Sequence, residues 1–513
     1  METRRDDASY VDIPYPSAPI RYTHPDILAV LGALHGLKPA PVDGCRVLEI
    51  GSGDGGNLVP MACSIPGGQF TGIEPSGPAI DRACALAQAS GARNVRFVNA
   101  GVEDVADGLG TFDYIVTHGV FSWVDAAVQE KILELSRRLL APDGLAYISY
   151  NTYPGWHARG MIREMMLYRI RHETRPQARV TLAREFLHRL SATVDATDKV
   201  GLSATDMAAF GSLLRHERAF LSEYPDAYFF HEHLERVNLP LYFHEFAARA
   251  GRHGLQYVSE ALYSSGVPSA YPAAVAKAVL EFSEDPLEQQ QMLDFVTNRT
   301  FRESVLCAAD RQLVRIPDAG ALKHFYVSSP LKSTKLEGDT ETFTVPWGWT
   351  ATTGDPSLRE ALLKIGASWP LPLAVDPISG FTPPARLGLL NWFSRGMLEF
   401  QAGPPRFRTS IDGRPAAPAL ARHQAQSGPT VTNLRHEQVT LDDLSRAWLL
   451  LLDGSRDVPE LVRHLSELAG QGKMSVSTPE GRPVMEPDER LQLLTTTVGQ
   501  FLRAMATSAL LSP

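Results

Sequence analysis

The sequence predicts an α/β fold, in which a Rossmann-like, doubly wound parallel sheet is followed by helical and mixed α/β segments. Two observations lead to this prediction. Short apolar stretches of strand length alternate with helical stretches over residues 46–150. The first apolar stretch also runs directly into a turn with three closely spaced glycines. With 513 residues, the chain is long enough for more than one domain.

The elements of this first part follow in a regular order. We expect strands at residues 46–50, 69–73, 95–98, 113–117 and 145–150. We expect the helices between them at residues 57–64, at 78–90 and after Asp125, where Val128, Ile132, Leu135 and Leu139 recur at near-helical spacing. The Ala-Pro-Asp-Gly turn at 141–144 separates the last helix from the fifth strand.

A helical segment rich in Arg, Glu and Leu covers residues 161–240 and interrupts this pattern. A helix, a glycine and a strand then continue the pattern up to about residue 260. We therefore assign residues 1–160 and 241–265 to the α/β core. Residues 161–240 are expected to be an inserted regulatory or substrate-covering unit near the carboxyl ends of the strands.

The rest of the chain has weaker signals. We expect a helical connector over 266–320 and a mixed α/β C-terminal domain over 321–513, with a Pro/Gly-rich loop or linker at 402–418. Residues 440–465 read as two helices broken at Asp453-Gly454. Such a pair occurs in DNA-binding domains, but few Lys and Arg residues cluster in the chain, which favours a protein-contact or dimerisation role.

Composition excludes several classes of protein. The net charge of −9 and the pI near 5.9 argue against an extended nucleic-acid-binding surface. We find no signal peptide, and no apolar run approaches the ~18 residues of a membrane span. The four cysteines lack metal or redox spacing, so we expect a reduced, cytoplasmic setting.

The glycine turn carries the strongest functional signal. Gly51, Gly53 and Gly55 let the backbone turn tightly and approach a ligand closely. Gly51, Gly53 and Gly56 also fit the dinucleotide pattern G-x-G-x-x-G. An acid precedes the turn at Glu49, where it can accept a hydrogen bond from an ammonium group.

Further signals follow the glycine turn in a fixed order. Glu74 ends the second strand, where an acid binds ribose hydroxyls. The fourth strand starts Phe112-Asp113, and the turn before the fifth reads Leu-Ala-Pro-Asp-Gly from Leu140. In this combination the chain resembles the class I S-adenosylmethionine-dependent methyltransferases.

The resemblance implies S-adenosylmethionine as cofactor. The chain departs from the family pattern at Gly101, where family members often carry an Asp that binds adenine. We expect Glu103 to take the place of this Asp, with Val102 packing on the adenine. Tyr15, Tyr22 and His24 precede the first strand, where a flap over the cofactor often lies. The expected cofactor-binding residues are Tyr22, His24, Glu49, Gly51, Gly53, Asn57, Glu74, Pro75, Val102, Glu103 and His118.

A narrower resemblance rests on several less general stretches. These stretches are 22–26, 55–61, 118–124, 149–157, 231–235 and 307–310. Together they resemble bacterial methyltransferases with a methyltransferase regulatory domain, a group that includes the rickettsial outer-membrane protein lysine methyltransferases. The resemblance implies a class I core, a helical middle domain and a winged-helix-like C-terminal domain. It implies lysine methylation only for some members.

The expected catalytic residues are His118, Asn151, Tyr153 and Trp156. His118 follows the fourth strand on the side where methyl acceptors bind, and the other three leave the fifth strand in a segment rich in aromatic groups. Such a pocket lowers the cost of deprotonating a lysine and tolerates a cationic product. Each has a structural alternative: a strand cap for His118, a turn for Asn151, and packing beneath the insert for the two aromatics.

Several functions remain open at this stage. The leading hypothesis is methyl transfer to a protein or peptide side chain such as lysine; a small-molecule acceptor and a non-catalytic, cofactor-binding scaffold are alternatives, and a dehydrogenase is a distant one. A dimer is possible. We expect no metal site, because His231 and His233 are two residues apart and point to different faces of a helix.

Overall fold

The computed structural model describes residues 17–105, 108–198, 204–376, 379–411, 413–478 and 481–513. The centre of the molecule is a seven-stranded sheet of order β3-β2-β1-β4-β5-β7-β6. Its strands are β1 (Arg46–Ile50), β2 (Gln69–Glu74), β3 (Val95–Asn99), β4 (Phe112–Thr117), β5 (Leu140–Asn151), β6 (Leu255–Glu260) and β7 (Phe301–Ala308).

Strands β1 to β5 pair in parallel, and β7 runs antiparallel to both β5 and β6. From β1 the chain moves outward to β3 and then returns to β4 on the other side of β1. This reversal of strand order opens a crevice outside the carboxyl ends of β1 and β4, where open α/β sheets bind ligands.

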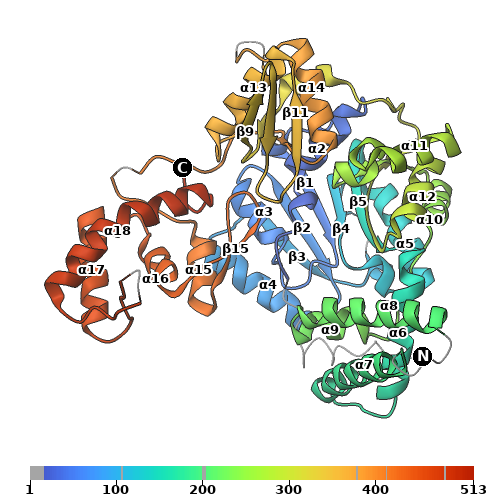
Figure 1. Ribbon diagram of the computed structural model, residues 1–513, viewed down its shortest axis with the longest axis horizontal. Coiled ribbons are helices and arrows are strands. Elements are labelled where there is room, and N and C mark those ends of the chain that lie inside the picture. The colour runs from blue at the N-terminus through green and yellow to red at the C-terminus, as the bar shows by residue number, and fades with distance from the viewer. Residues whose placement is uncertain (1–16, 106–107, 199–203, 377–378, 412, 479–480) are drawn as a thin grey trace.

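Helices cover both faces of the sheet (Figure 1). They are α2 (Pro25–Leu34), α3 (Leu58–Ser64), α4 (Gly77–Ser90), α5 (Ala126–Leu139) and α10 (Phe243–Arg252). Val47 packs in one hydrophobic cluster with Leu58, whereas the next residue, Leu48, packs in another with Ile132. Neighbouring strand residues thus bury opposite faces, which explains why the strands read as continuous apolar runs.

The sheet confirms the predicted Rossmann-like core but differs in two places. Strand β5 begins at Leu140, because this residue already pairs with Phe112 of β4, and the expected turn at 141–144 lies where the register of this pairing shifts. The expectation of a helical connector over 266–320 is wrong for residues 301–308, which form β7. The strand begins Phe-Arg-Glu, so it lacks an apolar signature there; its buried Arg302 is satisfied by ion pairs instead.

A helical lobe follows β5 and lies at the bottom of Figure 1. It consists of α6 (Gly155–Ile170), α7 (Pro176–Asp198), α8 (Ala204–Ser222) and α9 (Asp226–His233). These helices have their own apolar cluster, which includes Met166, Leu187 and Phe229. Two further helices, α11 (Ala273–Phe282) and α12 (Pro286–Thr297), connect β6 to β7.

The range 321–513, expected to be one domain, contains two hydrophobic cores. The first holds β8 (Tyr326–Ser328), β9 (Lys332–Glu337), β10 (Thr340–Thr344), β11 (Thr350–Thr353), α13 (Pro356–Ser368), β12 (Leu373–Ala374), α14 (Pro383–Ser394) and β13 (Glu399–Gln401). The second holds α15 (Ala419–Ser427), β14 (Thr430–Thr432), β15 (Gln438–Thr440), α16 (Asp443–Leu451), α17 (Val458–Gly470) and α18 (Pro487–Thr507). The first core includes Val30 and Leu34 of α2, so this unit packs directly on the methyltransferase-like core.

In the part of the chain that the structure describes, no helix is both long and apolar enough to cross a membrane. The same residues contain no group of three or more His, Cys, Asp or Glu side chains that is placed to hold a metal ion. His231 in α9 instead lies 3.1 Å from a carboxylate oxygen of Glu235, just after the helix, a structural contact.

Candidate active site

Two glycines of the loop between β1 and α3 have different surroundings. Gly51 has φ +77°, and a Cβ there would lie 2.4 Å from Cγ2 of Val120 in the segment after β4. Gly53 has φ +51°, and a Cβ there would have no neighbouring atom within 4 Å. Gly51 therefore allows close packing of the loop against the end of β4, whereas Gly53 borders open space in which a ligand can lie.

Glu49 places a buried carboxylate beneath this loop. Its Oε1 accepts a hydrogen bond of 2.7 Å from Nδ2 of Asn57, and its Oε2 has no hydrogen-bond partner among the described residues. Burial raises the pKa of Glu49 to about 8, and Asn57 only partly offsets this effect. A buried carboxylate oxygen without a donor is a site that a ligand cation, such as the ammonium group of S-adenosylmethionine, satisfies.

Glu74 lies at the end of β2, across the loop from Glu49. Its two carboxylate oxygens accept hydrogen bonds of 3.0 Å from the backbone N–H groups of Gly53 and Ser76. The acid therefore adjoins the open side of the glycine loop, where a ribose would bind. Pro75, which is exposed, is held by a hydrogen bond from Asn99 to its carbonyl oxygen.

These residues fit the cofactor that the sequence predicts, with Glu49 for the ammonium group, Gly53 for close backbone approach and Glu74 for the ribose hydroxyls. Val102 lies in a 3-10 helix after β3 and packs at the edge of a core cluster, while Glu103 is exposed. Their contact with adenine stays a prediction.

The flap residues divide into two kinds. Tyr22 is half-buried, and burial raises its pKa to about 12. His24 is fully buried and caps α2, because its Nδ1 accepts a hydrogen bond of 3.2 Å from the backbone N–H of Asp26. His24 thus serves the packing beneath the loop, and this position does not support its expected cofactor contact. Tyr15 lies outside the described residues.

His118 begins a hydrogen-bonded chain that spans three strands. Its Nδ1 lies 2.8 Å from the hydroxyl of Tyr147 in β5, and that hydroxyl donates a hydrogen bond of 2.8 Å to Oε1 of Glu303 in β7. Burial lowers the pKa of His118 to about 4 and raises that of Glu303 to about 7. At neutral pH His118 is therefore the neutral imidazole, which does not keep a proton by itself, whereas Glu303 both takes up and releases a proton near pH 7.

The tautomer of His118 follows from this chain. Tyr147 has one hydroxyl hydrogen, which it gives to Glu303, so its oxygen accepts the Nδ1–H of His118. The Nε2 of His118 then carries a lone pair. The turn that presents it is held by a hydrogen bond of 2.9 Å from the backbone N–H of Gly119 to Oγ of Ser149.

The other predicted catalytic residues do not join this chain. Asn151 is buried, and its Nδ2 donates a hydrogen bond of 3.0 Å to Asn238, which ties β5 to the segment after the helical lobe. Tyr153 is half-buried and stacks on His157 with ring centroids 4.0 Å apart. Trp156, in the first turn of α6, is 4% exposed and packs edge-on against Trp123 of the segment after β4, so it joins the helical lobe to the core, a packing role like the structural alternative.

Sequence reasoning missed Tyr147, Glu303 and a third residue, His436, whose Nε2 lies 2.8 Å from Oδ1 of Asn57. Tyr147 reads as an ordinary apolar strand residue. The other two lie far from the cofactor motifs along the chain, and no local pattern connects them to these motifs. Only the pairing of β7 with β5 and the docking of the C-terminal unit bring them to the site.

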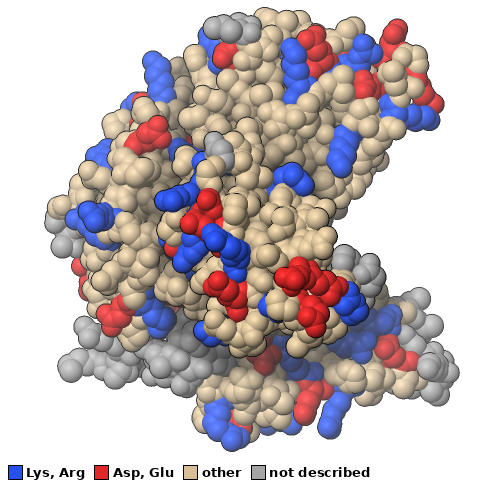
Figure 2. Space-filling view, turned by 90° about the vertical axis from the view of Figure 1, so that its left-hand side faces the viewer, with Lys and Arg blue, Asp and Glu red and all other residues tan. Residues whose placement is uncertain are grey.

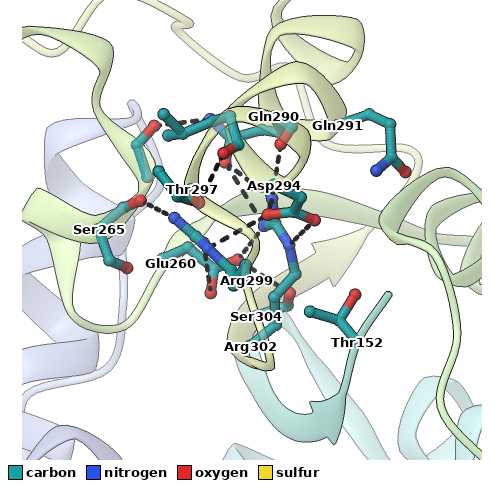
Figure 3. Close-up of polar contacts among 12 residues, drawn as sticks. Thr152, Glu260, Ser265, Gln290, Gln291, Asp294, Thr297, Arg299, Arg302 and Ser304 are labelled. Atoms are coloured by element: carbon teal, nitrogen blue, oxygen red, sulfur yellow. Dashed lines mark hydrogen bonds and ion pairs between the residues drawn. The ribbon is translucent and has the colours of Figure 1, made fainter. Parts of the chain in front are cut away.

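A buried charge network supports the sheet behind Glu303. Arg302 is fully buried and contacts Oε1 of Glu260 at 2.6 Å and Oδ1 of Asp294 at 2.8 Å, while Arg299 contacts the same Asp294 (Figure 3). Glu260 in turn accepts a hydrogen bond of 2.9 Å from the backbone N–H of Glu303. This network fixes the start of β7 and hence the position of the Glu303 side chain.

A surface depression of about 360 Å³ lies at the opposite, amino-terminal end of the strands, beside Arg46, Gln69 and Thr111. It is therefore separate from the candidate active site.

Comparison with protein-family models gives three matches. Residues 48–146 match a "methyltransferase domain", residues 225–308 a "predicted methyltransferase regulatory domain" and residues 413–510 a "PKMT, C-terminal winged helix domain". The regulatory-domain match thus covers α9 to β7, including two strands of the sheet, and overlaps the insertion to which we assigned that role, 161–240, only at residues 225–240. The winged-helix match covers the second C-terminal core.

Individual proteins are similar over nearly the whole chain or over about half of it. An uncharacterized protein of Rickettsia prowazekii is 28% identical, over 99% of this chain and 94% of its own length. A second uncharacterized protein of the same organism is 36% identical over 255 residues, which are 49% of this chain and 96% of that protein. The solved structure of PKMT2 from Rickettsia typhi in complex with AdoHcy superposes with a TM-score of 0.83 at 26% identity, covering 97% of this chain and 100% of that chain.

These matches agree with the glycine loop, its two acids and the order of the strands. The chain is therefore a member of the family of these rickettsial proteins, S-adenosylmethionine-dependent class I methyltransferases that carry a methyltransferase regulatory domain and a PKMT winged-helix domain.

Proposed function

We propose that this methyltransferase transfers a methyl group to the side-chain nitrogen of lysine in a protein substrate. The proposal rests on the chain of hydrogen bonds from His118 through Tyr147 to Glu303. The PKMT winged-helix match and the likeness to Rickettsia typhi PKMT2, a protein lysine methyltransferase by its name, support it.

Lysine needs such a chain because its ammonium form has no lone pair for attack. From a pKa near 10.4, deprotonation at pH 7 costs about 5 kcal/mol. His118 lies after β4 beside the glycine loop, since Val120 adjoins Gly51. The bound cofactor supplies an electrophilic methyl group, and the lysine nitrogen forms its C–N bond as the C–S bond breaks.

The proton moves away from this reaction through the chain. His118 takes the lysine proton on Nε2 and gives its Nδ1 proton to Tyr147, which gives its own hydroxyl proton to Glu303. Because the pKa of Glu303 is about 7, it holds this proton and releases it to water without a large free-energy cost.

Aromatic rings around His118 suit a cationic methylated product. Phe301 is 41% exposed and lies edge-on to His118 with ring centroids 6.0 Å apart, and Tyr147 stacks on the same ring. Tyr153, stacked on His157 and 5.2 Å from the ring of Tyr242, extends this aromatic surface near the end of β5. We assign Tyr153 and Asn151 to the positioning of the acceptor.

The residues that we propose to hold the cofactor are Tyr22, Glu49, Gly51, Gly53, Asn57, Glu74, Pro75, Val102, Glu103 and His118. On the face drawn in Figure 2, the Lys and Arg side chains of the described residues are interspersed with Asp and Glu and form no single basic area. This distribution supports a protein acceptor over a nucleic acid. A cytoplasmic location and a dimer remain predictions from the sequence.

The proposal is tested with S-adenosylmethionine that carries an isotopically labelled methyl group. The full chain is incubated with a bacterial proteome, and labelled peptides are mapped by mass spectrometry. We expect label on lysine Nζ atoms, and none with Glu74→Ala. Label that accumulates only in small molecules, or on other side chains, would overturn the lysine assignment.

A further inference from the structure

The winged-helix domain, residues 413–510, reaches the cofactor site through one side chain. The turn between β14 and β15 places His436 against the glycine loop, where its Nε2 lies 2.8 Å from Oδ1 of Asn57. His436 is 3% exposed, and its ring lies 5.3 Å from that of His24. The contact joins two elements that are 379 residues apart in the chain.

The orientation of the Asn57 amide follows from its other partners. Oδ1 accepts a hydrogen bond of 2.8 Å from the backbone N–H of Ile20, a group that can only donate. Nδ2 therefore faces Oε1 of Glu49, at 2.7 Å. Because His436 also faces Oδ1, its Nε2 must carry the hydrogen and donate it.

This arrangement makes His436 part of the environment of Glu49. An amide whose oxygen accepts hydrogen bonds becomes a stronger donor through its nitrogen, since such bonds polarise one another. Donation from His436 to Asn57 thus strengthens donation from Asn57 to the Glu49 carboxylate. It favours the ionised carboxylate, which is the form that attracts an ammonium group.

The turn is built to hold His436 in place. His436 has φ +61°, a left-handed conformation that is uncommon outside glycine. Oδ1 of Asn433 accepts hydrogen bonds of 2.9 Å from the backbone N–H groups of Arg435 and Glu437, and Leu434 donates to the carbonyl oxygen of Ala509 near the end of α18. The position of His436 is therefore tied to the core of the winged-helix domain.

Two further observations indicate a specific contact. Nδ1 of His436 is buried without a hydrogen-bond partner among the described residues, a cost that simple packing would avoid with an apolar side chain. Helix α15 of the same domain also packs against α4, the helix that follows Glu74 (Figure 1). The winged-helix domain thus contacts elements next to both cofactor acids.

We propose that His436 is a positioning residue through which docking of the winged-helix domain and binding of the cofactor reinforce each other. The domain orders Asn57 and Glu49 for the cofactor ammonium group. Because the two equilibria are linked, the bound cofactor strengthens docking of the winged-helix domain by the same factor by which docking strengthens cofactor binding. The proposal concerns cofactor binding alone, so it stands or falls independently of the methyl acceptor.

The test measures S-adenosylhomocysteine affinity of the full chain by isothermal titration calorimetry, without any acceptor. His436→Gly removes the ring but keeps the left-handed backbone accessible, and we expect about tenfold weaker binding. His436→Gln restores an N–H donor and should recover most of the affinity. If His436→Gly does not fold, His436→Asn replaces it, because Asn tolerates this backbone and is too short to reach Asn57.

The matched control is Asp457→Ala, which removes the N-cap of α17 inside the same domain but makes no contact with the loop. We expect it to leave the affinity unchanged. Hydrogen exchange supplies the reciprocal measurement. Ligand should slow exchange of the Arg435 and Glu437 amides in the natural chain and not in His436→Gly. Equal affinities for the natural chain and His436→Gly, or an unchanged exchange rate on ligand saturation, would overturn the proposal.

Discussion

The Tyr147 hydroxyl lies 2.8 Å from a carboxylate oxygen of Glu303, and this hydrogen bond connects β5 to the antiparallel strand β7. Because β7 starts beside the end of β5, its third residue lies at the edge where the parallel strands end. An acid from late in the sequence thereby reaches the side chain of His118. The same relationship depends on Arg302, which anchors the start of β7 in the buried charge network.

Replacing Glu303 by Gln should slow methyl transfer about a hundredfold, because the proton acceptor at the end of the chain is lost. In the natural chain the carboxylate must be ionised to accept a proton, so kcat should rise with pH and level off above about 7. Steady-state kinetics from pH 5.5 to 9 check this prediction. Glu341→Gln, in a distant buried acid of β10, is the control with an unchanged profile.

Replacing Glu49 by Gln should weaken cofactor binding about tenfold to hundredfold, since a charge-assisted contact to the ammonium group is lost. Without cofactor, the pKa of Glu49 is raised to about 8 in the folded chain, from a value near 4.5 in the unfolded chain. The contribution of Glu49 to the free energy of unfolding is therefore complete below pH 4.5 and is lost as the pH rises from about 4.5 to about 8. At about 1.4 kcal/mol per pKa unit, this loss is on the order of 5 kcal/mol. Calorimetric titrations and urea unfolding between pH 5 and 9 measure both effects. A cofactor affinity that does not depend on pH in the natural chain would contradict the role given to Glu49.

Replacing Arg302 by Met should destabilise the fold by about 3–5 kcal/mol, because Glu260 and Asp294 would remain buried without their main cation. Chemical denaturation gives the free energy of unfolding. Arg311→Met, which removes a partly exposed arginine, should cost less than about 1 kcal/mol. Similar losses in the free energy of unfolding for the two variants would show that the buried network does not stabilise β7.

Replacing Trp156 by Ala should lower the free energy of unfolding by about 3–5 kcal/mol, since the indole is buried where the helical lobe packs on Trp123 of the core. The kcat of the folded fraction should change less than about threefold. Unfolding curves and initial rates on the same preparation separate the two effects. A tenfold loss of kcat at unchanged stability would return Trp156 to the catalytic residues.

The sequence predicts the residues on the cofactor side of the site but few of those on the methyl-acceptor side. Glu49, Gly51, Gly53 and Glu74 lie within one strand–turn–helix–strand unit, so their order along the chain already fixes their neighbourhood in space. His118 could be placed because it follows a recognisable strand. Tyr147 could not, since a tyrosine in a buried strand gives no sign of which group its hydroxyl meets.

The other features that the sequence did not predict share a physical cause. The start of β7 reads as polar because Arg302 is buried through ion pairs, which no hydrophobic pattern reveals. His436 depends on how a separate domain docks, and Trp156 depends on packing between the lobe and the sheet. Such contacts join segments that are distant in the chain, and a single sequence does not contain the pairing.

The central claim, that lysine is deprotonated through His118 and then methylated, is tested most directly by one measurement. Transfer of a labelled methyl group from S-adenosylmethionine to protein is followed by mass spectrometry with the natural chain and with His118→Phe, which keeps the ring volume but removes the acceptor nitrogen. We expect label on lysine Nζ with the natural chain and a loss of about a hundredfold in the rate at saturating cofactor with His118→Phe. Equal rates for the two proteins, or label on a group other than lysine, would contradict it.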